Sequence, residues 1–475
     1  MSNFYITTTL PYVNAKPHIG FALEIVQADV VARYRRQLGD EVFFNTGTDE
    51  HGLKIYRKAL EENKEPQKYV DEYAVKFDHL KKALNLSYNS FIRTTNKNHI
   101  KAAQYFWQEC FKRGDIYKKN YKVKYCVGCE LEKTESELKN GRCPLHPNIE
   151  LDVIDEENYF FKFSAYKDKL LKLYRDNPNF VYPKHRLNEI KKFIERGPED
   201  FSISRLKSKM PWGVSVPGDD TQVMYVWFDA LINYISCLGW PDESEIGLYS
   251  KFWPGVQLAG KDNLRQQAAM WPAMLLSAGL PVPKKIFIHG FITSGGQKMS
   301  KSLGNVIDPL YYTDKYGVDA VRYYLLKEII PFEDSDFTQE KFERVYRSDL
   351  ANGLGNLAVR VTNLVEKNNL DFDLSPVGND SLVDKVGQYM EDYNFNLALE
   401  VLWAKLRGYD EDITKAEPWK IKRTDKLKQV LEPITQGILD IAVLLQSFLP
   451  ETADKIIKNL SAKKIKKAEI LFPRI

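Results

Sequence analysis

The beginning of the chain alternates between short apolar runs and one long helical stretch. Residues 4–9 are β-branched and aromatic, which predicts a buried strand. From Ile19 to about Gln37, apolar residues recur at helical spacing, and residues 41–44 form a second strand-like run before the polar loop 47–52. Strand, helix and strand in so short a stretch predict a βαβ unit, and therefore a parallel sheet with a right-handed crossover.

The alternation of predicted strands and helices is interrupted and later resumes. Short apolar strands return at 256–258 and 286–289, with a helical stretch between them, and beyond about residue 340 leucines recur at every third or fourth position. We therefore expect an α/β protein in which a Rossmann-like parallel sheet is split by an insertion and followed by an α-helical bundle. The expected boundaries are 1–117 and 201–305 for the two halves of the sheet domain, 118–200 for the insertion, 306–345 for a linker region and 346–475 for the bundle.

Composition limits the classes of function. The 475 residues are 44% hydrophobic, which excludes global disorder, and 68 basic against 64 acidic residues leave a formal net charge of +4. A polyanion would therefore have to be bound by a local patch. Neither a membrane-spanning run of about 20 apolar residues nor a signal peptide is recognisable, so we expect a cytoplasmic protein with no membrane partner.

Three of the five cysteines lie in one short stretch with a histidine. Cys126-x-x-Cys129 is followed, after thirteen residues, by Cys143-x-x-His146, which is a strong zinc spacing. Four protein ligands complete a tetrahedron and leave no open position, so the ion would be structural. The alternative is a set of buried thiols without a metal.

Residues 17–21, Pro-His-Ile-Gly-Phe, stand between the first predicted strand and the first predicted helix. A helix N-terminus offers unpaired N–H groups and a partial positive charge, which suit a phosphate. Gly20 lets a ligand approach the backbone closely, and His18 supplies a side-chain donor. Alone, the motif also fits a loop histidine that merely caps the helix.

A second stretch, residues 295–305, carries Lys298 and Lys301 between glycines. Two mobile ammonium groups suit a triphosphate whose β- and γ-phosphates must be held while the α-phosphorus reacts. The alternative is a solvated surface loop. Together, the two stretches predict nucleotide chemistry driven by cationic groups gathered at one edge of the sheet.

With further segments, these stretches make the sequence similar to the class I aminoacyl-tRNA synthetases, and within that family to its methionine-specific members. The resemblance runs from Leu10 to about Trp419 and includes residues 46–52, 202–205, 226–230 and 260–262. It implies ATP-dependent activation of L-methionine to an adenylate, with Mg²⁺ accompanying ATP, and transfer to the 3′ end of the methionine tRNA. Because the substrate carboxylate attacks, catalysis would be positioning and charge neutralisation.

The resemblance also implies roles for individual residues, and it places the zinc ion in a knuckle of an inserted connective-peptide domain. The catalytic residues would be His18, Arg205, Lys298 and Lys301, and ATP would be bound by His18, Ile19, Gly20, Glu24, Lys261, Lys298 and Lys301. Methionine would be bound by Asp49 through its ammonium group, and by Leu10, Tyr12, Trp227, Ala230, Leu231, Tyr234, Asp262, Asn263 and Gln267. The anticodon would be read by Asn356, Arg360 and Trp419. Trp227, Tyr234 and Trp419 could instead be core aromatics, and Asp229 and Asp262 could be structural.

Three positions depart from the family pattern. Phe21 replaces a usual histidine, Asn263 a common isoleucine, and Gln267 a pocket histidine that, unlike glutamine, can be protonated. Two alternatives therefore stay open: a relative that activates an amino acid for another carrier, and an inactive tRNA-binding protein. The anticodon positions argue against the first and the lysine loop against the second. The chain lacks the appended C-terminal domain through which some relatives dimerise, so we expect a monomer.

Overall fold

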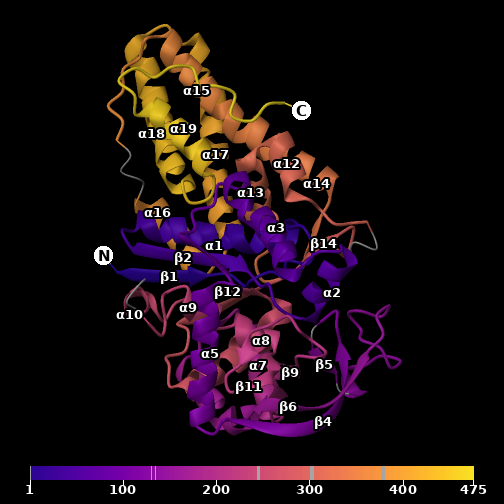
Figure 1. The fold of residues 1–475 in the computed structure, drawn as a ribbon. Helices are drawn as coiled ribbons and strands as arrows, with labels where there is room; N and C mark the ends of the chain where they lie inside the picture. Colours follow the sequence, from indigo (N-terminus) through magenta and orange to yellow (C-terminus); the bar gives the residue numbers. More distant parts are fainter. Residues whose placement is uncertain are drawn as a thin grey trace.

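The computed structural model describes residues 2–129, 131–133, 135–242, 247–299, 304–375 and 380–474. Figure 1 shows a sheet with its helices in the middle of the molecule, a helical bundle at one end and a strand-rich insertion at the other. The α/β class, the split parallel sheet and the C-terminal helical bundle are thus confirmed.

The central sheet joins segments that are far apart in the sequence. β1 (Asn3–Thr7) lies between β2 (Glu41–Thr48) and β12 (Val256–Gly260). Because the chain continues to opposite sides of β1, a crevice is expected at the carboxyl ends of β1 and β12, where open α/β sheets bind their ligands. The full strand order is β3 (Ser90–Arg93), β2, β1, β12, β13 (Lys285–His289) and β7 (Val181–Tyr182), and every pairing in it is parallel.

Two details differ from the pattern prediction. β2 continues through Thr48, so that the expected polar loop 47–52 is partly strand; a Cβ on Gly47 would lie 1.8 Å from the carbonyl oxygen of Ile92, and only glycine permits this close approach of β3. In addition, β7 comes from inside the range expected for the insertion but pairs with β13 at the sheet edge. The domain boundaries themselves stay a prediction.

Helix α1 (Ile19–Gln37) runs through the interior, between the sheet and α13 (Val318–Lys327). Its burial is continuous from Ala22 to Ala32 and includes Glu24 and Asp29, so polar groups on this helix need partners inside the protein. The other helices around the sheet are α2 (Leu53–Glu61), α3 (Pro66–Asp78), α4 (Leu80–Ala83), α5 (Lys97–Lys112), α8 (Val226–Ala230), α9 (Asn233–Ser236), α10 (Tyr249–Phe252) and α11 (Trp271–Ala278).

The insertion is built on an antiparallel sheet with the strand order β5, β4, β6, β8. Its longest strand ends at Cys126, and the cysteine loops follow directly. The strands of this sheet are β4 (Ile116–Cys126), β5 (Leu131–Lys133), β6 (Asp152–Phe161) and β8 (Phe201–Ser202). The neighbouring elements along the chain are α6 (Lys167–Asp176), α7 (Lys184–Glu195) and a second small sheet of β9 (Ser204–Leu206), β10 (Ser215–Val216) and β11 (Asp219–Met224).

A connecting region leads from the sheet to the bundle. It contains β14 (Ile292–Ser294), β15 (Gln297–Lys298), α12 (Pro309–Tyr316), α13, β16 (Ser335–Phe337) and α14 (Gln339–Val345), which continues as a π-helix over Tyr346–Gly355. The bundle consists of α15 (Asn356–Lys367), α16 (Asp380–Glu391), α17 (Phe395–Ala416), α18 (Thr424–Leu445) and α19 (Pro450–Leu460). Within the described ranges, no helix combines the length and the apolar character that crossing a membrane requires.

Candidate active site

The N-terminus of α1 is capped by His18. The backbone there is extended, and the Nδ1 atom of His18 accepts a hydrogen bond of 3.1 Å from the amide of Gly20. Because Nδ1 accepts, the proton of the neutral ring resides on Nε2, which can donate to a ligand. Desolvation at the start of α1, together with the ammonium of Lys298, lowers the pKa of His18 below its ordinary value of 6.5. His18 is therefore a neutral N–H donor at pH 7.

The lysine loop lies against this helix end. The methyl group of Met299 would be 3.6 Å from a Cβ placed on Gly20, and the amide of Ile19 donates to the carbonyl of Ile307 at 3.0 Å. Lys298 is close enough to His18 to affect its pKa. The two stretches that the sequence singles out for nucleotide chemistry thus meet. Lys301 and the rest of the range 300–303 lie outside the described residues.

A second cation accompanies Lys298. The ammonium groups of Lys261 and Lys298 lie 4.6 and 5.4 Å from the centre of the Phe291 ring, and Lys261 also pairs with Asp334 at 2.6 Å. The side chain of Asp262 folds back over Gly260, where its Oδ1 atom would be 2.9 Å from an added Cβ. Beside the start of α1, an open groove is lined by Lys16, Pro17, Tyr73, Val306 and Asp308.

Glu24 forms a buried ion pair with His289, a residue that sequence reasoning missed. One carboxylate oxygen of Glu24 accepts from the amide and the hydroxyl of Thr9, both at 2.6 Å, and the other lies 2.9 Å from the Nε2 atom of His289. The Nδ1 atom of His289 faces the carbonyl of Gly290 at 2.7 Å. Burial opposes the charge on His289, but the two acceptors outweigh it and raise its pKa. The sequence could have indicated this residue, because His289 ends strand β13 and ligands of open α/β sheets bind at the carboxyl ends of the strands.

The residues predicted to enclose the methionine side chain come together. Tyr12 meets Trp227 edge to face, with ring centres 6.3 Å apart, and Tyr234 is fully buried and accepts a 2.6 Å hydrogen bond from the amide of Gln267. The Nε1 atom of Trp227 and the Oε1 atom of Gln267 are buried without a hydrogen-bond partner within the described ranges, which leaves polar atoms for a ligand. The other predicted members Ala230 and Leu231 are buried, whereas Leu10 is partly buried.

Two local features shape this pocket. The buried Asp49 lies beside Tyr12, to which its backbone is paired by an isolated parallel bridge. Residues Gln266–Met270 form a π-helix, a local irregularity frequent at functional sites, and both Gln266 and Gln267 are buried in it. Asn263 lies just before this segment, in the short 3₁₀ turn Lys261–Asn263.

Asp229, two residues after Trp227, is paired with two buried histidines. Its carboxylate oxygens lie 2.6 Å from the Nδ1 atom of His51 and 2.8 Å from the Nε2 atom of His99, whose Nδ1 atom is 2.8 Å from the hydroxyl of Ser236. Burial opposes ionisation of Asp229, but the histidines outweigh it and lower its pKa to about 2. Asp229 therefore ties the helix that carries Trp227 to the loop that follows Asp49.

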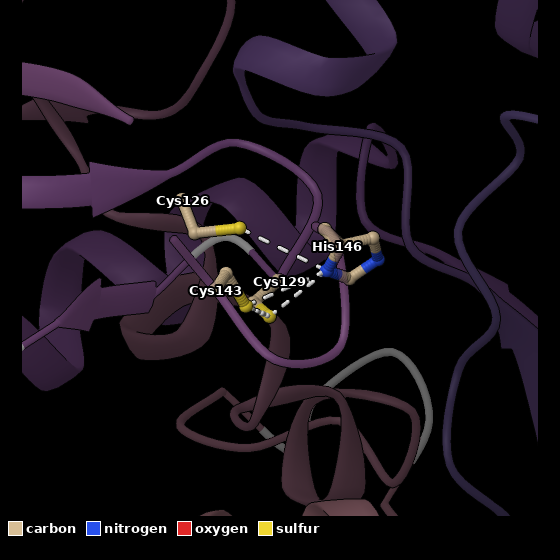
Figure 2. A group of neighbouring side chains, drawn as sticks. All are labelled: Cys126, Cys129, Cys143 and His146. Atoms are coloured by element: carbon tan, nitrogen blue, oxygen red, sulfur yellow. Dashed lines mark hydrogen bonds between the residues drawn. The ribbon is translucent and has the colours of Figure 1, made fainter. Parts of the chain in front are cut away.

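Cys126, Cys129, Cys143 and His146 form a compact group (Figure 2), and their ligand atoms all lie within 4.8 Å of one another. The Sγ atom of Cys129 is 3.4 Å from that of Cys143 and 3.2 Å from the Nδ1 atom of His146. A tetrahedral ion with metal–sulfur bonds of about 2.3 Å holds its ligand atoms about 3.5–3.8 Å apart, which is close to this spacing. The group therefore fits a structural metal ion.

The metal group is packed against the pocket. Tyr125 and Val127 form one apolar cluster with Val226, and Tyr12 and Trp227 pack on it. A Cβ on residue 128 would lie 2.6 Å from the imidazole ring of His146, so only glycine fits there.

Arg205 is buried in contacts of its own. Its guanidinium donates to the hydroxyl of Ser202 at 2.6 Å and to the carbonyl of Ser204 at 2.7 Å, and it lies over the rings of Tyr225 and Tyr125. These contacts connect β9 to the strand that leads into the metal group. A catalytic role for Arg205 stays a prediction.

The predicted anticodon residues lie together in the bundle. The guanidinium of Arg360 is 5.2 Å from the ring centre of Trp419 and donates to the carboxylate of Asp410 at 2.9 Å, while Asn356 lies exposed one turn before Arg360. Trp419 is 53% exposed, which rules out a core position. An exposed ring beside a guanidinium is a surface on which a base can stack.

Known proteins share this arrangement. The family model described as "tRNA synthetases class I (M)" matches residues 4–151 and 129–362. Methionine–tRNA ligase of Thermotoga maritima is 41% identical over 96% of this chain and 75% of its own length, and that of a Nostoc species is 42% identical over 96% and 89%. The solved structure of Mycobacterium tuberculosis methionyl-tRNA synthetase in complex with methionyl-adenylate is 35% identical, has a TM-score of 0.94 and is matched over 100% of both chains.

Fold and site together define a class I aminoacyl-tRNA synthetase. Within that class, the chain belongs to the methionine–tRNA ligases.

Phe21, the departure from the family pattern nearest to His18, gives a first prediction. Its ring packs edge to face on Phe77 of α3, with centres 5.5 Å apart. Phe21→His is expected to leave the fold intact and to speed adenylate formation about threefold to tenfold, because a neutral hydrogen bond is worth roughly 0.5–1.5 kcal/mol. The measurement is the pre-steady-state rate of adenylate formation, and an unchanged rate would contradict a phosphate-facing role for this position.

Proposed function

We propose that this chain activates L-methionine with ATP, releases pyrophosphate, and transfers the methionyl group from the adenylate to the 3′ end of a methionine tRNA. The observation that carries the proposal is the meeting of His18 and Gly20 with Lys298 and Met299 at the crevice of the sheet. The sequence similarity to methionine–tRNA ligases, which extends over nearly the whole chain, supports this proposal.

In the activation step, the protein supplies donors where phosphate charge must be held. The Nε2–H group of His18 and the partial positive charge at the start of α1, where Ile19 and Gly20 lie, would bind the phosphates of ATP, and Lys298 with Lys301 would hold the departing pyrophosphate. Lys261 would add a further cation, and Arg205 is proposed to act in the same step. Magnesium, when bound with ATP, would share the phosphate charge.

Glu24 has a less direct role in this proposal. Both of its oxygens are engaged by Thr9 and His289, so Glu24 would fix the floor of the ATP site and contact the nucleotide through water or metal. Asp262, at the crevice end of β12, is proposed to lie between the nucleotide and the amino acid.

The amino-acid site would place the methionine carboxylate for attack on the α-phosphorus. Asp49 would bind the ammonium group, and the thioether would lie among Tyr12, Trp227 and Tyr234, since aromatic rings suit a polarisable sulfur. Gln267 would orient the hydroxyl of Tyr234. Leu10, Ala230, Leu231 and Asn263 would complete the enclosure.

For the second step, the RNA would bind along the bundle, with Trp419 stacked on an anticodon base and with Asn356 and Arg360 bonded to base edges. The metal held by Cys126, Cys129, Cys143 and His146 is proposed to be one zinc ion, because three thiolates and one imidazole are typical ligands of structural zinc. We further propose that the protein acts as a cytoplasmic monomer.

The test is methionine-dependent exchange of pyrophosphate into ATP, measured beside the charging of initiator and elongator methionine tRNAs. Both activities are expected. Exchange without charging would favour a carrier other than tRNA, and the loss of both in a folded protein would favour an inactive tRNA-binding protein; either result would contradict the proposal.

A further inference from the structure

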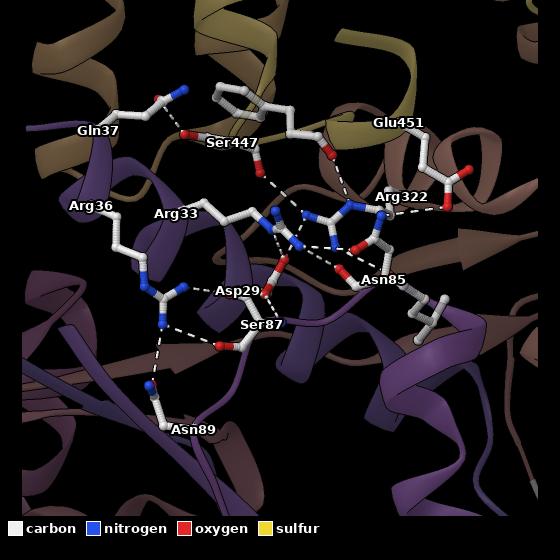
Figure 3. Close-up of polar contacts among 12 residues, drawn as sticks. Asp29, Arg33, Arg36, Gln37, Asn85, Ser87, Asn89, Arg322, Ser447 and Glu451 are labelled. Atoms are coloured by element: carbon white, nitrogen blue, oxygen red, sulfur yellow. Dashed lines mark hydrogen bonds and ion pairs between the residues drawn. The ribbon is translucent and has the colours of Figure 1, made fainter. Parts of the chain in front are cut away.

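An ionic network with a fully buried pair at its centre lies far along α1 from the catalytic end. Asp29 accepts from Arg322 of α13 and from Arg33 of its own helix, both at 2.8 Å, and the amide and the hydroxyl of Ser87 each donate to it at 2.6 Å. Asp29 and Arg322 are 0% exposed. Figure 3 shows that this network gathers side chains from α1, α13 and the segment around Ser87.

The same guanidinium also donates hydrogen bonds to the connection that follows bundle helix α18. Arg322 donates to the carbonyl oxygens of Phe448 at 2.8 Å and Ser447 at 3.2 Å, in the short connection between α18 and α19, and to that of Leu84 at 3.1 Å. Buried backbone carbonyls in such a connection have no partner in a helix or a strand, so the N–H groups of a buried guanidinium satisfy them. Arg322 thus bonds α1 and the connection between α18 and α19 with one planar group.

Neighbouring contacts secure the same junction. The Gln37 amide donates to the carbonyl of Val443 at 3.0 Å, and its oxygen accepts from the hydroxyl of Ser447 at 2.6 Å. Asp319, also on α13, accepts from the amide of Thr452 in the first turn of α19 at 2.6 Å. The bundle is therefore attached to α1 and α13 by directional polar contacts.

The helices that meet at this network end at two functional surfaces. From Asp29, α1 leads back to its start at Ile19, about 15 Å away at 1.5 Å per residue. In the other direction, α18 runs from Leu445 back to Thr424, about 30 Å away, and Trp419 precedes that helix by five residues. The network thus lies where the helix of the phosphate site meets the C-terminal end of α18, whose other end follows Trp419.

Stability alone is a poor explanation of this arrangement. Taking charges out of water is costly, and well-packed apolar residues of the same volume often do as well. What an ionic network with fixed directions adds is a defined angle between the parts it joins. A ligand that must occupy two distant sites at once depends on that angle, because binding at the second site is lost when geometry forbids it.

We propose that Arg322 and Asp29 are positioning residues, which hold the bundle at the angle at which one tRNA reaches the anticodon surface and the adenylate together. This inference rests on the proposed function. Activation of methionine needs no tRNA and should not depend on the angle. Binding of an isolated anticodon stem–loop should not depend on it either.

The test is Arg322→Met, which removes the charge and keeps most of the side-chain length. We expect methionine-dependent pyrophosphate exchange and the Kd for an anticodon stem–loop RNA to stay within about twofold of the unaltered protein. The kcat/KM for charging full-length tRNA is expected to fall about tenfold or more. If exchange and charging instead fall by the same factor, Arg322 acts only through stability and the proposal is wrong.

Two further variants serve as controls for this test. Arg33→Met is the matched control, because Arg33 also pairs with Asp29 but donates its other hydrogen bonds to Asn85, and within the described ranges it has no hydrogen bond or ion pair with the bundle; charging should be unaffected. The double variant Asp29→Asn with Arg322→Met removes both charges of the buried pair, so it should regain thermal stability relative to Arg322→Met while charging stays low. Recovery of charging would overturn the proposal.

If the unaltered chain exchanges pyrophosphate but charges no tRNA, the proposed function fails instead.

Discussion

Replacing His18 by alanine is expected to slow the formation of methionyl-adenylate by about 10²–10³-fold, the usual effect of removing one donor that holds developing charge. The substitution removes the Nε2–H donor and also the acceptor that orders the Gly20 amide at the start of α1. The measurement is the single-turnover rate of adenylate formation at saturating ATP and methionine, with the circular dichroism spectrum as a check on folding.

His18→Asn is the control for the capping role, because asparagine also accepts a hydrogen bond from a helix amide and is a good N-cap residue. If capping were the whole function of His18, asparagine would restore the rate. We expect it to restore stability and to leave most of the rate loss in place. A rate for His18→Ala within about threefold of the original would remove His18 from the phosphate site.

The protonation state of His18 leads to a pH prediction. Because the pKa of His18 is lowered, the ring stays neutral as the pH falls through 6.5. The kcat/KM for ATP, which reports groups of the free enzyme, should therefore stay level to below pH 6.5 and decline only when Nδ1 is protonated and the Gly20 hydrogen bond is lost. A decline centred on 6.5 that His18→Asn abolishes would contradict the lowered pKa.

Local features of the site could be predicted from the sequence because their residues are close along the chain. The start of α1 follows from one motif and a helical pattern, and the metal group follows from two pairs of ligands with tight spacing. The pairing of β1 with β12 follows only indirectly, from the return of strand-like runs after the insertion. β7 gave no such signal, since two residues are too few to show a period.

The partners of buried polar groups could not be predicted in this way. Glu24 lies on α1 and His289 at the end of β13, 265 residues further along the chain, and each is stable in the core because the other is present. The π-helix around Gln267 was hidden for a different reason: no residue pattern distinguishes a single turn of π-helix from an α-helix in this stretch. The pairing of Glu24 with His289 can therefore be recognised only in the folded chain, because no single window of the sequence contains both residues.

Removing the metal ion is expected to impair methionine activation as severely as a change within the pocket. A structural zinc ion contributes roughly 10 kcal/mol to local folding, so the loops of Cys126–Cys129 and Cys143–His146 should lose their structure without it. Tyr125 and Val127 would then no longer support Val226 and the half-buried Trp227. Because misplacing a pocket by about 1 Å can lower a rate about a hundredfold, we expect a decrease of that size in pyrophosphate exchange.

Cys143→Ser tests this without a chelator, and Cys110→Ser is its matched control, because Cys110 is also a buried thiol but lies on α5 outside the metal group. One zinc ion per chain is expected in the control by elemental analysis and none in Cys143→Ser. Full exchange activity in a metal-free protein would refute the structural link between knuckle and pocket.

The contacts also predict which substrate is affected most. The apolar cluster of Tyr125 and Val127 reaches Tyr12 and Trp227 on the amino-acid side of the crevice, whereas the cap of α1 by His18 is formed within residues 18–20. Loss of the ion should therefore raise the KM for methionine by a larger factor than the KM for ATP. An equal rise in both would mean that the metal group supports the whole crevice through the lysine loop, and a selective rise for ATP would place its influence on the phosphate side.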